Sequence, residues 1–126
     1  MKKYSLEIVQ TADGEESIVA ADALGEAEDG RAYLKYAFDG AEYSLYIGAD
    51  FIRQERAGEV NIVTEFKCGK RTLGKISDGS GEGAFPIFTS GLDVVFDGEN
   101  VKAVCVFSDG EGGGEIRLCI SAALVG

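Results

Sequence analysis

The sequence predicts an all-β fold, a single closed antiparallel barrel of about 8–10 strands of the lipocalin or calycin type. Six Asp-Gly dipeptides divide the chain, and Asp-Gly favours hairpins because type I′ turns need positive φ at both central residues. Between these dipeptides, apolar and polar residues alternate with the period of a β-strand. Helical spacing has one candidate, residues 17–29, which Gly25 interrupts and which lacks a capping pattern.

The alternating runs define ten expected strands, in chain order 4–8, 17–27, 31–38, 42–47, 51–56, 60–66, 71–77, 85–96, 101–107 and 115–122. The reversals between them lie at the Asp-Gly pairs 13–14, 29–30, 39–40, 78–79, 97–98 and 109–110, at Gly58 and at Cys68-Gly69. We expect a bend or bulge at Gly25 and a break near Ser90-Gly91. The run over 71–77 is polar, which indicates an edge strand or a solvated wall.

Closure of the sheet follows from the order of the strands. Consecutive strands joined by tight turns pair as a meander, and a flat meander would leave two free edges and an uncovered apolar face. Closing the sheet into a barrel removes the free edges and covers the apolar face. A two-sheet sandwich built from the same strands is the alternative. We expect residues 1–126 to form one domain whose interior contains Leu6, Ile8, Leu34, Tyr36, Phe38, Leu45, Ile62, Phe66, Ile87, Val94, Phe96, Val104, Val106, Leu118 and Ile120.

The net charge of −10, from 12 basic and 22 acidic side chains, argues against nucleic acid and membrane partners. Only residues 51–77 are locally positive. The first residues alternate in polarity and contain no apolar run of the kind a signal peptide needs. The three cysteines, Cys68, Cys105 and Cys119, are odd in number and widely spaced, so we expect reduced thiols and a cytoplasmic location.

Several chemistries are excluded by residue type or context. The chain contains no histidine, which removes serine triads, Cys–His dyads and histidine zinc sites. The glycine-rich loops 78–83 and 109–115 lack the following helix that a phosphate loop requires, and Asp109, Glu111 and Glu115 do not match EF-hand spacing. The carboxylate pairs Glu15-Glu16 and Glu28-Asp29 lie beside turns, where water is plentiful, whereas general acid catalysis needs one carboxyl of a pair to be desolvated. We therefore predict no enzyme activity, no catalytic residue, no cofactor and no metal.

The cysteines and the basic side chains are the remaining candidates. Cys105 and Cys119 alternate with apolar residues, as small core residues do, and Cys68 between Lys67 and Gly69 is the most plausible reactive thiol.

Arg53, Arg56 and Lys75 are the predicted ligand-binding residues. One of the two arginines should face the interior, where an arginine can anchor an anion. Because Phe51 is the large apolar residue of its strand, its parity favours Arg53, together with Glu55. The alternative is an exposed, salt-bridged arginine.

The motifs in the second half of the chain resemble the YwiB-like family. They comprise Arg56-Ala57-Gly58, Phe66-Lys67-Cys68-Gly69, Thr72-Leu73-Gly74, a glycine-rich turn, Phe88-Thr89-Ser90-Gly91-Leu92 and the two final strands. Ile76 and Phe107 occupy positions where we expect tyrosines. The resemblance implies a bacterial protein of uncharacterised function, with a barrel similar to those of lipocalins and fatty-acid-binding proteins. It implies no catalytic residues.

Two functions remain open. The first is a binding module that holds a small amphipathic or anionic ligand in the barrel, by analogy with similar architectures. The second is a structural or protein-interaction domain whose barrel is filled by its own side chains. An enclosed volume of ~300 Å³ or more would favour the first.

Overall fold

The computed structural model describes residues 1–28, 30–109 and 114–125, which form ten antiparallel strands closed into one barrel. The predicted all-β barrel is confirmed, and the sandwich alternative is wrong. Among the described residues, no helix is long and apolar enough to cross a membrane. The strands are β1 (Lys2–Ala12), β2 (Glu15–Glu28), β3 (Arg31–Phe38), β4 (Ala41–Gly48), β5 (Phe51–Ala57), β6 (Asn61–Lys67), β7 (Arg71–Asp78), β8 (Gly81–Asp97), β9 (Asn100–Ser108) and β10 (Ile116–Leu124).

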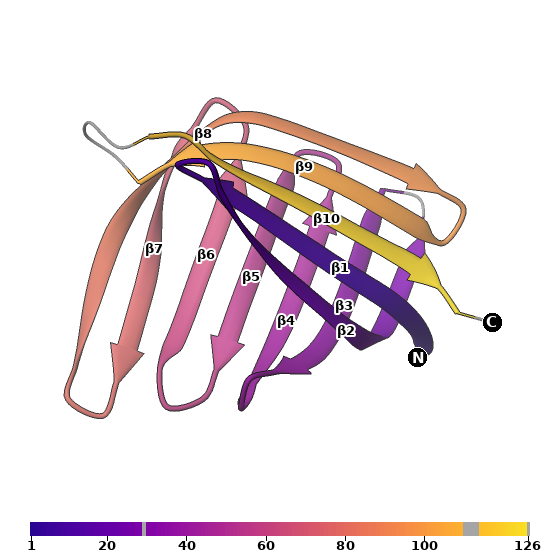
Figure 1. The fold of residues 1–126 in the computed structure, drawn as a ribbon, viewed down its shortest axis with the longest axis horizontal. Coiled ribbons are helices and arrows are strands. Elements are labelled where there is room, and N and C mark those ends of the chain that lie inside the picture. The colour runs from indigo at the N-terminus through magenta and orange to yellow at the C-terminus, as the bar shows by residue number, and fades with distance from the viewer. Residues whose placement is uncertain (29, 110–113, 126) are drawn as a thin grey trace.

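The topology is an up-and-down meander in which each strand pairs with the next along the chain. The barrel closes where β1 pairs with β10, from Tyr4 opposite Leu124 to Ala12 opposite Ile116. Figure 1 shows this seam, with indigo β1 beside yellow β10 and both ends of the chain at the same end of the barrel. β7 pairs on both sides, so it is not an edge strand, although it is largely exposed as a solvated wall would be.

The glycine of β2 allows a close approach between backbones. No register shift occurs at Gly25, so the bulge considered there is absent. A Cβ atom at this position would lie 1.9 Å from the carbonyl oxygen of Tyr33 on β3, a distance that no side chain could tolerate. The break expected near Ser90-Gly91 is confirmed, because the pairing of β8 with β9 shifts register between Thr89 and Gly91.

Two Asp-Gly hairpins have the predicted geometry. Asp13 and Gly14 have φ of 52° and 76°, and Asp39 and Gly40 have φ of 50° and 79°. Positive φ at both central residues is the requirement of a type I′ turn. At residues 97–98 only Gly98 has positive φ, 62°, which is the pattern of a type II′ turn.

The Asp78-Gly79 reversal is built by a different mechanism. Neither Gly79 nor Ser80 has positive φ, so the type I′ prediction is wrong here. Instead, the Asp78 carboxylate accepts hydrogen bonds from the backbone N–H of Ser80 at 2.8 Å and of Gly81 at 3.1 Å. This side chain replaces the turn backbone as the organising group. In two further predicted reversals, Asp29 and Gly110 lie outside the described residues.

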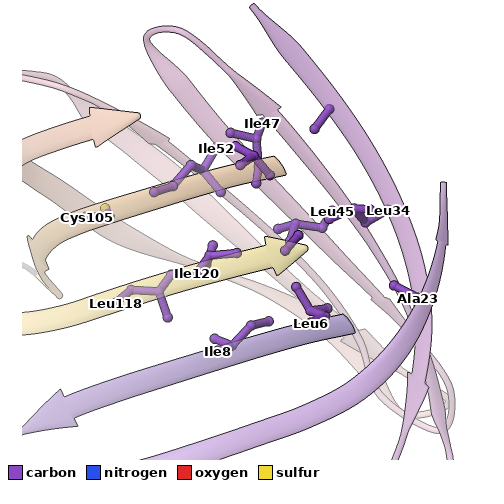
Figure 2. Packing of buried hydrophobic residues seen from close by; sticks show 14 of the residues in the cluster. Leu6, Ile8, Ala23, Leu34, Leu45, Ile47, Ile52, Cys105, Leu118 and Ile120 are labelled. Carbon is purple, nitrogen blue, oxygen red and sulfur yellow. The ribbon is translucent and has the colours of Figure 1, made fainter. Parts of the chain in front are cut away.

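Most of the expected interior is confirmed. Leu6, Ile8, Leu34, Tyr36, Leu45, Phe66, Ile87, Leu118 and Ile120 are buried in one cluster, part of which Figure 2 shows. Ile62, Val94 and Phe96 are partly buried. Phe38 is 38% exposed because it lies at an open end of the barrel.

The expected face of β9 is wrong. Val101, Ala103 and Cys105 are the buried residues, so Val104 and Val106 face outward. Val104 and Val106 make the outer face apolar in the second half of this strand, which removes the local contrast there, although Asn100 and Lys102 mark the outer face in the first half.

A candidate ligand site at the barrel mouth

The two ends of the barrel interior are filled differently. Tyr4, Leu6, Leu34, Ile47 and Ile52 fill the end near the chain termini and are almost completely buried. At the opposite end the interior opens into a cavity of about 150 Å³. Side chains from six strands line this cavity: Ile8, Gln10, Ser17, Val19, Tyr36, Phe38, Tyr43, Gln54 and Leu118.

Two tyrosines form one wall of the mouth. Tyr36 on β3 is directly opposite Tyr43 on β4, and both side chains point into the barrel. Their rings stack with centroids 4.9 Å apart and planes 5° from parallel. Burial raises the pKa of Tyr36 to about 12, so this phenol keeps its proton at any physiological pH.

Gln54 and Arg56 on β5 hold these two phenols in place. Ile52 is fully buried, and residues two and four positions later lie on the same inner face. The Gln54 amide Nε2 donates a hydrogen bond of 2.8 Å to the Tyr36 hydroxyl oxygen. The Arg56 Nε donates one of 3.2 Å to the Tyr43 hydroxyl oxygen, and its Nη1 donates to the Val60 carbonyl.

The Arg56 guanidinium has no carboxylate partner among the described residues, whose ion pairs involve other cations. A partly buried arginine that lacks a counter-ion favours the binding of an anion, because the anion would neutralise its charge. The mouth therefore combines an apolar floor with polar side chains, and one positive charge, that of Arg56, lies behind Tyr43 without itself lining the cavity.

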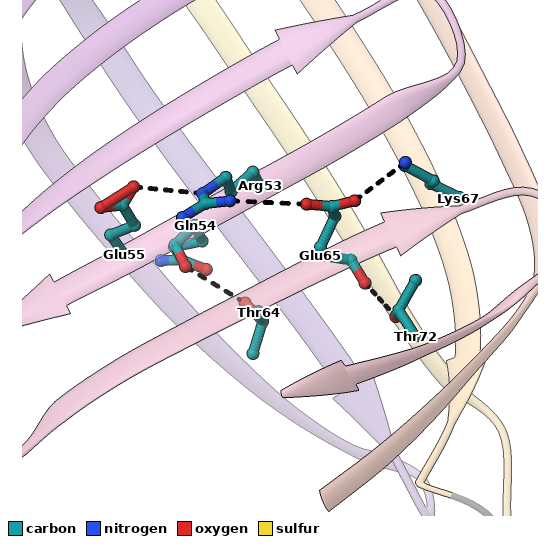
Figure 3. A network of polar contacts seen from close by, with 7 residues as sticks. All are labelled: Arg53, Gln54, Glu55, Thr64, Glu65, Lys67 and Thr72. Carbon is teal, nitrogen blue, oxygen red and sulfur yellow. Dashed lines mark hydrogen bonds and ion pairs between the residues drawn. The ribbon is translucent and has the colours of Figure 1, made fainter. Parts of the chain in front are cut away.

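The structure corrects the choice between the two arginines. Arg53 faces outward, because Ile52 rather than Phe51 marks the inner face of β5. Its Nε lies 3.2 Å from a Glu55 carboxylate oxygen, and its Nη1 lies 3.6 Å from one of Glu65 (Figure 3). Lys67 also pairs with Glu65, at 3.1 Å. The alternative of an exposed, salt-bridged arginine describes Arg53, and the interior position belongs to Arg56.

Lys75 does not share a site with either arginine. It faces outward from β7, opposite Val63 of β6. There it lines an open groove of about 570 Å³ with Asn61, Ser77 and Glu82. Of the three predicted ligand-binding residues, only Arg56 contacts a side chain that lines the mouth cavity, the Tyr43 hydroxyl, and none of the three lines the cavity itself.

A larger hollow of about 620 Å³ lies on the outer wall, where Tyr33, Tyr46 and Phe51 meet the β4–β5 turn. Acidic Glu26, Glu28 and Asp50 and basic Arg31 line it as well. We favour the mouth because its polar groups converge from inside the barrel and its charge is unpaired.

The thiols differ in their surroundings. Cys105 is buried, and burial raises its pKa to about 12, which makes it inert. Cys68 is exposed, and its reactivity stays a prediction. Cys119 is half-buried and lies on the outer face, opposite in parity to Leu118 and Ile120, so its expected core position is wrong.

Acidic side chains do not form a metal site in the described ranges, where no three potential ligands come together. Glu15 and Glu16 are exposed at the β1–β2 turn. Asp29 of the second carboxylate pair and Glu111 of the loop 109–115 lie outside the described residues.

Tyr43, Gln54, Gln10 and Ser17 are site residues that the sequence did not single out. Only the pairing of strands brings them together, Gln10 opposite Ser17 on β1 and β2, and Tyr43 and Gln54 on the neighbouring strands β4 and β5. Ile52 was a usable signal, because it is the one aliphatic residue of its strand apart from Ala57. Gln54 and Arg56 follow Ile52 by two and four positions and therefore lie on the same face of the strand.

The fold and the mouth together define a small closed ten-strand β-barrel that opens at one end. No family model and no curated protein matches the chain. Among solved structures, the barrel is similar to the ywiB protein from Bacillus subtilis. The TM-score is 0.75 with 16% sequence identity, over 98% of this chain and 91% of that one. This likeness confirms, at the level of the fold, the resemblance drawn from the glycine and turn motifs.

Proposed function

We propose that this protein is a lipocalin-like binding module that holds a small anionic or amphipathic molecule in the barrel mouth. The observation that carries the proposal is Arg56, whose guanidinium lies directly behind the cavity-lining Tyr43 and contacts its phenol and a carbonyl but no carboxylate of the described residues. A ligand anion would supply the missing counter-charge.

The filled end of the barrel limits the size of the ligand. The cavity of about 150 Å³ corresponds to about five water molecules at ~30 Å³ each, below the ~300 Å³ of common ligand pockets. Leu6, Leu34 and Leu45 occupy the space that a long acyl chain would need. The mouth therefore suits a compact molecule, or the charged end of a larger one that extends into solvent.

The same filled end favours a second function, a structural or protein-interaction domain with no small ligand. In that case the mouth would be a solvated end of the core. The absence of histidine and the net charge of −10 support both functions over an enzyme or a nucleic acid or membrane partner. The three free, widely spaced thiols support a reducing compartment such as the cytoplasm.

The test compares two arginines of one strand that face opposite ways. Small acidic, neutral and basic molecules are titrated by calorimetry, and binding is mapped by amide chemical shifts. We expect Arg56→Gln to weaken acid binding at least ~10-fold, because it removes a charge-assisted contact. Arg53→Gln, the matched control on the outer face, should change it less than ~2-fold.

Two results would contradict the proposal, the first by removing the binding module and the second by removing the mouth as its site. If no acid binds the wild-type protein, the filled structural domain is the better description. If both variants bind equally well, the anion site lies elsewhere. Thermal melts of both variants show whether either substitution has disturbed the fold.

A further inference from the structure

The direction of the hydrogen bonds at the mouth specifies what the ligand must offer. A guanidinium has donors only, so the Tyr43 oxygen must accept from Arg56. The Gln54 amide nitrogen likewise donates to the Tyr36 oxygen. Each phenol is therefore an acceptor within the protein, and its own O–H proton remains to be donated.

No described residue accepts either proton, since each phenol's hydrogen bond is the one that it receives. The two hydroxyls belong to stacked, directly paired residues that line the same cavity. The mouth thus presents two neighbouring O–H donors, with the Arg56 charge one hydrogen bond behind Tyr43 and the neutral Gln54 amide behind Tyr36. A group that matches this arrangement has two acceptor atoms, close together and negatively charged.

From this arrangement, and resting on the proposed function, we infer that the ligand is a carboxylate whose two oxygens each accept one hydrogen bond, from Tyr36 and Tyr43. Bonds from O–H to O⁻ are short and about twice as strong as neutral ones. The chain from guanidinium to phenol to carboxylate strengthens each member by polarisation. Arg56 is in this scheme a positioning residue for Tyr43 as well as a source of charge.

Other ligand groups fit the mouth less well. A primary amide has one acceptor oxygen, and its NH₂ would face the second phenol proton. An ammonium has no acceptor and would meet the Arg56 charge. A phosphonate has acceptors but carries bulk and a third oxygen that two donors leave unmatched.

The experiment titrates three probes of similar size, butyrate, butyramide and propylphosphonate, against the intact protein by calorimetry at constant pH. We expect butyrate to bind at least ~10-fold more tightly than either of the other two. Tyr36→Phe and Tyr43→Phe should each weaken butyrate ~10-fold or more, because each removes one O–H donor and keeps the ring.

The outer wall provides a closely matched control. Tyr33 and Tyr46 are directly paired on the same two strands, with ring centroids also 4.9 Å apart, but they face outward. Tyr33→Phe and Tyr46→Phe should leave butyrate binding within ~2-fold of wild type, since neither hydroxyl lines the mouth. Tyr43 is less buried than Tyr36, so we expect Tyr43→Phe to fold even if Tyr36→Phe does not. In that case Tyr43→Phe alone provides the test.

The outcomes separate this inference from the proposal beneath it. Tight butyramide or propylphosphonate binding that depends on Arg56 would retain the anion or ligand site and overturn the carboxylate. Butyrate binding that survives the Tyr36→Phe/Tyr43→Phe double change would overturn the two-phenol arrangement alone. If none of the three probes binds, the proposed function fails and the inference fails with it.

Discussion

Thr89 on β8 has a hydroxyl that lies inside the barrel without a hydrogen-bond partner among the described residues. The residue is 1% exposed and follows Ile87 on the inner face. Its backbone is fully used, because its N–H donates to Lys70 and its carbonyl accepts from Gly69. A buried hydroxyl that loses its water contacts without gaining a partner destabilises the fold.

We expect Thr89→Val to raise the free energy of unfolding by roughly 1 kcal/mol, because valine keeps the branched shape and removes the unsatisfied oxygen. Urea unfolding followed by circular dichroism measures the change. Ser5→Val, at an exposed position of β1, controls for a general gain in β-propensity. A loss of 1 kcal/mol or more in Thr89→Val would show that the hydroxyl does have a partner.

The reversals that connect the strands use two kinds of residue chemistry. Asp39-Gly40 depends on backbone conformation, with φ of 50° and 79°, whereas Asp78-Gly79 depends on a side-chain carboxylate. Hydrogen bonds from Ser80 and Gly81 lower the pKa of the Asp78 carboxyl, so the turn keeps its acceptor at neutral pH. Two identical dipeptides therefore tolerate substitution differently.

Gly40→Val should destabilise the protein by more than ~1 kcal/mol, because a β-branched residue is strained at positive φ. Gly79→Val should cost less than ~0.5 kcal/mol, since its φ is not positive and a Cβ meets nothing within 4 Å. Chemical denaturation of the two variants side by side provides the measurement. Equal losses would mean that the two turns share one mechanism after all.

The same strands and turns show how much of the structure could be predicted from sequence patterns. The strands, their order and the closure could be predicted because Asp-Gly pairs and alternation are local signals. The inner face of a strand is harder to predict when its two faces have similar polarity. Phe51 did not indicate the inner face of β5, because its ring lies over Gly48 on the outer wall. A Cβ atom on Gly48 would lie 2.2 Å from that ring. Contacts between strands, such as that between Gln54 and Tyr36, have no local signal at all.

At the scale of the whole molecule, the buried ionisable groups determine how the fold responds to alkali. Burial raises the pKa of Tyr36 to about 12 from 10.0 and that of Cys105 to about 12 from 9.0, and it also raises the pKa of Tyr4. These groups bind their protons more tightly in the folded state than in the unfolded chain. Their contribution to stability is therefore complete below pH 9 and declines as the pH rises toward 12.

We expect the free energy of unfolding to fall between pH 9 and 11, and to fall less steeply in the Tyr36→Phe/Cys105→Ala variant. Urea titrations at several pH values give the slope for each protein. The Tyr33→Phe/Cys68→Ala variant, with both changes at more exposed sites, should follow the wild type. A wild-type stability that does not change across this range would contradict the prediction.

The seam between β1 and β10 has a consequence for biosynthesis. These strands register along nine residue pairs from Tyr4–Leu124 to Ala12–Ile116, although more than a hundred residues separate them in the chain. A ribosome releases β1 first and β10 last, so the nascent chain carries one unpaired border of β1 until the tenth strand emerges. Neighbouring hairpins can form as they appear, but closure waits for the final strand and costs the loop entropy of nearly the whole chain. During synthesis, the border of β1 is therefore the segment on which a chaperone, or another nascent chain, would find a vacant edge.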